Sequence, residues 1–70
     1  MAAGTEDLLI VAARHVVEGE AVVTRQRNTI AKLAAAGHPT AQAERTLDLF
    51  LSTLAIFIDH ERALRAERNR

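Results

Sequence analysis

Cysteine, tryptophan and tyrosine are absent from this 70-residue sequence, and phenylalanine occurs only twice. Without cysteine the chain can form no disulfide, no thiolate metal site and no thiol nucleophile. It also lacks an excess of either charge, because nine basic residues balance nine acidic ones. A neutral chain has no general attraction to nucleic acid or to an anionic membrane surface. We therefore expect no nucleic-acid partner and no membrane partner.

Long hydrophobic runs are missing as well. The longest mainly apolar stretch, Leu47 to Ile58, has 12 residues and contains Asp48, whereas a helix needs about 20 apolar residues to span a bilayer. The first 13 residues have no Lys or Arg ahead of their apolar part, so they lack the basic start of a signal peptide. These features predict a cytoplasmic protein.

The sequence offers little to catalysis. It contains no glycine-rich phosphate loop, no nucleophile elbow and no His-Glu zinc motif. Its single serine, Ser52, lies in the middle of a predicted helix. Two helices on their own form no enclosed pocket for a substrate. We expect neither an enzymatic activity nor a cofactor.

Apolar residues make up 49% of the chain and lie at helical spacing on either side of one turn. Gly37 favours a helix end because glycine adopts the left-handed conformation without strain. Pro39 disfavours helical geometry at the residue before it. Thr40 and Thr5 are each expected to cap a helix by accepting a hydrogen bond from a free backbone amide. The sequence predicts a single hairpin over residues 1–70, with a first helix at about 5–36, a turn at 37–40 and a second helix at about 40–68.

Each predicted helix carries an apolar stripe when its residues are placed about 100° apart. The first stripe holds Leu8, Ala12, Val16, Val22, Val23, Ile30 and Leu33. The second holds Leu47, Phe50, Leu51, Leu54, Phe57, Ile58 and Leu64. A short turn makes the helices antiparallel, with residue i beside residue about 77 − i. This pairs Val23 with Leu54 and sets His15 level with Glu61. The predicted fold is all-α, an antiparallel two-helix hairpin.

Other aliphatic residues point away from these stripes, notably Leu49 and Ile56 on the second helix and Val17 on the first. A core of this size supplies only about 3–5 kcal/mol. We therefore expect two hairpins to form a four-helix bundle, with a homodimer favoured over higher oligomers, or one hairpin to dock on a larger protein. An accessory subunit of the second kind would be partly molten in isolation. The predicted interface residues are Val17, Leu47, Leu49, Phe50, Leu54, Ile56 and Phe57.

Three residues interrupt the first apolar stripe. Gln26, paired across a two-fold axis, could fix register and oligomeric state as buried polar residues do in coiled coils. Alternatively it lies at the margin of the stripe and reaches water, and spacing alone does not decide between these. His15 is the other candidate for a polar core position. Gly19 indicates close packing, because a glycine inside a helix costs about 1 kcal/mol relative to alanine.

A metal- or ligand-binding bundle is the alternative function. His15 and Glu18 are one helical turn apart, and the expected register sets His60 and Glu61 at the same level. Repeated by a two-fold axis, these side chains would resemble the inward-facing ligands of metal-binding bundles. However, Glu18 and His60 lie towards the edges of their stripes, and the Glu-x-x-His repeats of di-iron bundles are missing. A hydrogen bond from His15 to Glu18 or Glu61 is the simpler interpretation. The leading prediction is a non-catalytic protein–protein interaction module.

A resemblance to a known group covers roughly residues 13–64. It rests on His15, Glu18-Gly19-Glu20, Arg25-Gln26, Ile30, Leu33, Gly37-His38, Thr40, Ala43-Glu44, Leu47, Phe50, Thr53-Leu54 and His60. In these residues the chain resembles short helical-hairpin proteins of unassigned activity that are common in alphaproteobacteria, rhizobia and their relatives especially. That group usually has an acidic residue where Pro39 stands and often a histidine where Phe57 stands. The resemblance implies a hairpin in the bacterial cytoplasm and transfers no function.

Overall fold

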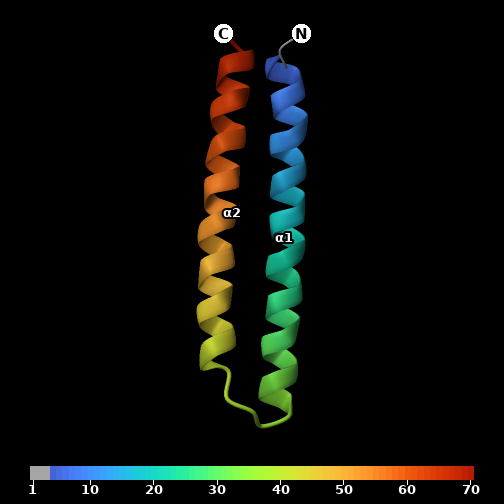
Figure 1. The fold of residues 1–70 in the computed structure, drawn as a ribbon, viewed down its shortest axis with the longest axis vertical. Helices are drawn as coiled ribbons and strands as arrows, with labels where there is room; N and C mark the ends of the chain where they lie inside the picture. Colours follow the sequence, from blue (N-terminus) through green and yellow to red (C-terminus); the bar gives the residue numbers. More distant parts are fainter. Residues whose placement is uncertain (1–3) are drawn as a thin grey trace.

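The computed structural model describes residues 4–70, which form two long helices, α1 (Thr5–Ala35) and α2 (Ala41–Arg68). The helices lie side by side and antiparallel, in a rod 53 Å long and 17 by 15 Å across (Figure 1). The expected all-α hairpin is thus confirmed, whereas its assembly into a four-helix bundle stays a prediction. Residues 1–3, which belong to the segment considered as a signal peptide, lie outside the described residues. Within residues 4–70, neither helix is both long and apolar enough to cross a membrane.

The turn begins where glycine was expected to end the first helix. Gly37 has a φ of 76°, in the left-handed region. Its amide donates to the Ala34 carbonyl at 3.0 Å, and the His38 amide donates to the Leu33 carbonyl at 2.9 Å. This is the pair of bonds that closes a helix at a left-handed glycine. The chain then climbs back along α1 before α2 begins, so α2 starts above the level at which α1 ends (Figure 1).

The expected side-chain caps do not form. The residue before α1 is Gly4, and Thr5 is already helical, with no side-chain capping bond. Thr40 does precede α2, but its hydroxyl donates to Oε2 of Glu44 at 3.1 Å instead of accepting from an amide. Its backbone angles, φ −113° and ψ −4°, differ from the extended conformation that directs a capping side chain at the first amides. Thr40 therefore occupies the predicted cap position without the predicted bond, and the prediction of Thr5 as a cap was wrong.

The seam between the helices has the spacing of a coiled coil. Buried and half-buried residues recur at alternating intervals of three and four residues, the repeat of helices that wind around each other. On α1 this series runs through Leu9, Ala12, Val16, Gly19, Val23, Gln26, Ile30 and Leu33. On α2 it runs through Ala43, Leu47, Phe50, Leu54, Phe57, Glu61 and Leu64. Other half-buried residues flank the series: Thr5, Ala13 and Val22 on α1 and Thr46, Leu51 and Ile58 on α2.

This winding corrects one member of the predicted stripe. Leu9 is 8% exposed and lies in the seam, whereas Leu8 is 46% exposed. A straight helix drifts by about 20° per seven residues relative to a coiled coil. Val23 and Leu9 are two such repeats apart. When residues are placed 100° apart, as on a straight helix, this drift brings Leu8 into the predicted stripe and moves Leu9 to its edge. Because the helices wind around each other, the seam follows Leu9.

The register between the helices differs from the expected one by about one helical turn. Leu54 contacts the backbone of Gly19 rather than lying opposite Val23. The His15 ring lies over Phe57, whereas the predicted register set it level with Glu61, one helical turn further along α2. The shift follows from the turn, since the segment after Gly37 runs back along α1 and carries the start of α2 with it.

Candidate functional site

The hydrophobic core of the single hairpin is thin. Among the described residues only Leu9, Ala12 and Val23 are buried, all three are in α1, and no large side chain is fully enclosed. Phe50 and Phe57, in the seam of α2, are only half-buried. The chain exposes 5314 Å² of surface, whereas scaling predicts about 4,300 Å² for a compact monomer of this mass. The hairpin therefore leaves roughly 1,000 Å² more surface in water than a compact fold of the same mass.

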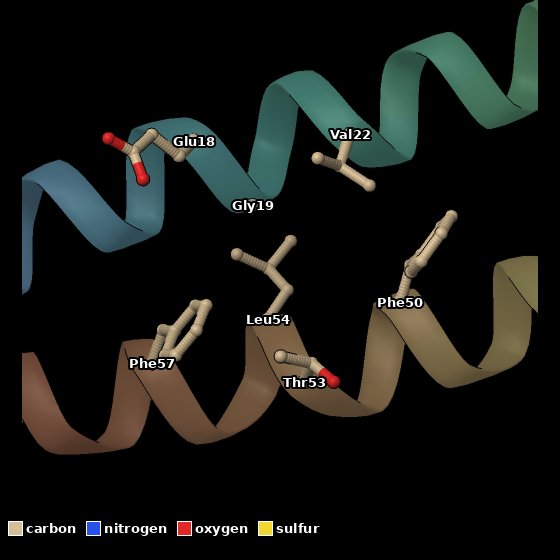
Figure 2. A pocket seen from close by; sticks show the side chains of 7 residues that line it. All are labelled: Glu18, Gly19, Val22, Phe50, Thr53, Leu54 and Phe57. Carbon is tan, nitrogen blue, oxygen red and sulfur yellow. The ribbon is translucent and has the colours of Figure 1, made fainter.

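A hollow of about 340 Å³ opens on one side of the seam near the middle of the rod. The side chains of Leu54 and Phe50 rise from α2 towards α1, and Leu54 points at the bare backbone of Gly19 (Figure 2). The residues that line the hollow are Glu18, Gly19, Val22, Phe50, Thr53, Leu54 and Phe57. All but Glu18 and Thr53 are apolar or lack a side chain, so the hollow has an apolar lining and two polar residues at its rim.

Gly19 shapes this hollow. A Cβ atom on Gly19 would lie 3.1 Å from Cδ1 of Leu54 and 3.5 Å from Cδ2 of Phe57. The first distance is shorter than ordinary van der Waals contact, so Leu54 would have to shift by a few tenths of an ångström to admit an alanine here. Gly19 therefore packs closely against Leu54, as expected for a glycine inside the helix.

Exposed aliphatic side chains flank the hollow on both helices. Leu49 and Ile56 are 68% and 66% exposed, and they lie four and three residues from Thr53, hence on its side of α2. Val11, 44% exposed, lies seven residues before Glu18 and on the same side of α1. We call this side the hollow face. It comprises Leu8, Val11, His15, Glu18, Val22 and Arg25 of α1 and Leu49, Thr53, Ile56 and His60 of α2.

Val17 belongs to a different face. It is 65% exposed and lies about 100° around α1 from Glu18, turned away from the hollow. Ile10, seven residues earlier and 59% exposed, shares this opposite face. The predicted interface residues outside the seam thus divide between two faces, Leu49 and Ile56 on one and Val17 on the other.

The two faces differ in charge along α2. On α2, the residues of the hollow face are those that lie three or four apart in the series through Thr53. From Gln42 to Ala63 this series contains no acidic or basic residue, with histidine taken as neutral. Over the same range of α2, the steps through Leu51 meet Glu44, Asp48 and Arg62 on the opposite face. On α1 the two faces are alike, with Glu18, Arg25 and Lys32 on the hollow face and Glu6, Glu20 and Arg27 on the opposite one. The hollow face is therefore the better candidate for contact with another protein, because charged residues are depleted at the centre of interfaces.

Gln26 joins the two helices directly. Its half-buried Nε2 donates to the carbonyl oxygen of Ala43 at 2.9 Å. The bond lies within the hairpin, and both interpretations of this residue, the pair across a two-fold axis and the position at the margin of the stripe, stay predictions. His15, in contrast, is exposed, with its ring 5.2 Å from that of Phe57 and tilted by 35°. In the single hairpin it therefore covers the seam from outside, and its role as a polar core residue of a bundle stays a prediction.

The candidate metal ligands do not converge in the hairpin. Oε2 of Glu61 accepts from the Arg65 guanidinium at 3.3 Å, and the shifted register separates His15 from it. Glu18 and His60 are exposed. Within residues 4–70, no three histidine, aspartate or glutamate side chains lie close enough together to hold a metal ion.

No protein-family model, curated protein or solved structure matches this chain. The resemblance to the alphaproteobacterial hairpin proteins stays a prediction.

The hollow and its rim were not expected from the sequence. Val22 was placed in the seam and Thr53 was given no role, although both line the hollow. The one sequence signal for the hollow is Gly19, a residue without a side chain at a position of the helix that faces α2. The sequence alone does not locate the hollow, because that also requires the register between the two helices.

Proposed function

We propose that this chain is a non-catalytic protein–protein interaction module that self-associates through the hollow face into a four-helix bundle. One observation carries the proposal: among the described residues α2 buries no side chain, while Leu49 and Ile56 lie exposed beside an apolar hollow. The bacterial cytoplasm is the setting implied by the resemblance described above.

The amount of surface supports this function. A stable interface buries about 800 Å² on each partner, and the chain exposes 5314 Å², roughly 1,000 Å² above the value expected for a compact monomer. Removal of apolar surface from water contributes about 25 cal/mol per Å². A second hairpin laid on the hollow face would cover Leu49, Ile56 and Val11 and complete the core around Phe50 and Phe57.

A second copy is favoured over an unrelated partner by the charge pattern. The α2 side of the hollow face is uncharged from Gln42 to Ala63, so it can meet its own copy without repulsion. On the α1 side, Glu18 lies on the same side of the helix as two basic residues, Arg25 and Lys32, so charges of both signs are available there. A face that is complementary to itself is what a two-fold dimer requires.

Ile56→Asp and Val17→Asp test the proposal as a matched pair. The two side chains are nearly equally exposed in the hairpin, 66% and 65%, but they lie on different faces. We expect the wild-type chain to be a dimer in light scattering coupled to size-exclusion chromatography. Ile56→Asp should be monomeric, because an aspartate in the interface would lose its water without gaining a partner. Val17→Asp should remain dimeric.

Two results would contradict the proposal. One is a wild-type chain that stays monomeric and fully helical over the whole dilution series. The other is dissociation by Val17→Asp but not by Ile56→Asp, which would move the interface to the opposite face.

A further inference from the structure

We propose that the two hairpins of the dimer pack antiparallel, α1 against α1 and α2 against α2, with Glu18 of each copy facing Arg25 of the other. The inference rests on the proposed self-association through the hollow face. It adds the direction of packing, the position of the two-fold axis and the residues that select the second copy as the partner.

The first argument is the charge pattern of α1. Glu18 and Arg25 are seven residues apart and therefore lie on the same side of the helix, where Glu18 lines the hollow. Both are exposed, and within residues 4–70 neither takes part in an ion pair. When two such helices run antiparallel about an axis midway between these residues, each glutamate meets the arginine of the other copy. The dimer then gains two equivalent pairs.

The second argument is the matching pattern on α2. Leu49 and Ile56 are also seven residues apart, on the same side of their helix, and both are exposed. In an antiparallel arrangement about their midpoint, Leu49 of one copy lies against Ile56 of the other, and the reverse. These are the two most exposed large aliphatic side chains of α2, and one operation covers both.

The two midpoints fall at the same level of the rod. The contact between Gly19 and Leu54 fixes how the levels of α1 and α2 correspond. In that register, the midpoint of Glu18 and Arg25 differs from the midpoint of Leu49 and Ile56 by about one residue, or ~1.5 Å of helix rise. A single two-fold axis perpendicular to the helices therefore satisfies both patterns. Val22 and Thr53, which line the hollow, lie closest to this axis.

The other possible axis fits less well. A two-fold axis parallel to the helices would lay α1 of one copy against α2 of the other at equal levels. Glu18 would then lie near Ile56 and Arg25 near Leu49, so two charges would lose water against aliphatic side chains without gaining a partner. The antiparallel arrangement replaces both mismatches with opposite charges and with aliphatic contacts.

Single cysteines test the geometry cleanly because the chain has none of its own. Val22→Cys places one thiol per chain next to the proposed axis, within the short range that a disulfide spans. Thr24→Cys is the control, two residues further on and turned towards the opposite face. After mild oxidation we expect Val22→Cys to run as a covalent dimer and Thr24→Cys to remain uncrosslinked. Far-UV circular dichroism checks that both variants keep the helical content of the wild type.

Charge reversal tests the pairing separately. Glu18→Arg should weaken the dimer about tenfold, because it sets two like-charged pairs in place of two attractive ones. Arg25→Glu should do the same, and the double variant should recover the wild-type dissociation constant. Additive losses in the double variant would overturn the pairing, and an uncrosslinked Val22→Cys would overturn the antiparallel axis. In either case a dimer that Ile56→Asp still dissociates would leave the proposed function standing.

Discussion

At Gly19, helix propensity favours alanine, whereas the close contact with Leu54 favours glycine. Replacing it with alanine should stabilise the isolated hairpin by up to about 1 kcal/mol, the difference in helix propensity. The new Cβ would lie 3.1 Å from Cδ1 of Leu54, but this methyl is the end of a flexible side chain and can move into the hollow beside it. Thermal unfolding of Gly19→Ala in the Ile56→Asp background, which isolates the hairpin, measures the effect.

Ala21→Gly provides the matched control for that measurement. It reverses the same exchange at an exposed position of α1, so its loss of stability reports helix propensity alone. We expect the gain from Gly19→Ala to be slightly smaller than the loss from Ala21→Gly, because Leu54 has to move. A Gly19→Ala hairpin that melts below its parent would show that Leu54 is held rigidly and that the hollow has no room for it.

At the scale of the two helices, Gln26 fixes register. Its bond to the Ala43 carbonyl is the hydrogen bond from a side chain that links α1 to α2 within residues 4–70. Gln26→Ala should cost about 1 kcal/mol in urea unfolding, the net value of one such bond. Gln26→Leu should stay near the wild-type stability, because it replaces the bond with apolar contact in the seam. Gln42→Ala, an exposed glutamine on α2, is the control and should change stability by less than about 0.5 kcal/mol.

Equal losses in Gln26→Ala and Gln42→Ala would contradict this role, since the Ala43 bond would then contribute nothing. A large loss in Gln26→Leu would show instead that the seam needs an amide at this level.

The arrangement of the two helices follows from local chemistry that a sequence displays. Gly37 and Pro39 act within their own few residues, so the turn could be predicted, and the helices end within one residue of the expected limits. The exposure of Leu49 and Ile56 likewise followed from their spacing alone. Such features require no knowledge of how one helix sits on the other.

Features that depend on both helices at once could not be predicted in this way. The seam selects Leu9 over Leu8 because the helices wind around each other, a property of the pair. The register shifted by one turn because the segment after Gly37 climbs along α1, and this shift separated His15 from Glu61 and opened the hollow opposite Gly19. Thr40 makes no capping bond because its backbone is not extended and its hydroxyl is turned towards Glu44, to which it donates.

For the whole molecule, the thin core leads us to expect that folding and the proposed association are two parts of one event. Only three of the described residues are buried in the single hairpin, and a helix pair of this kind gains most of its stability from the faces it covers. If the hollow face is covered by a second copy, dissociation should remove much of the support for α2, which buries no residue alone. Helical content and oligomeric state should then fall together on dilution.

Thermal unfolding at several protein concentrations tests this coupling. The Tm of the wild-type chain should rise by several degrees for each tenfold increase in concentration, because mass action favours the folded dimer. The Tm of Ile56→Asp should be lower and independent of concentration, since that variant has no dimer to favour. Val17→Asp, altered on the opposite face, should follow the wild-type slope. A wild-type Tm that does not move with concentration would mean that α1 and α2 hold each other folded without a second hairpin.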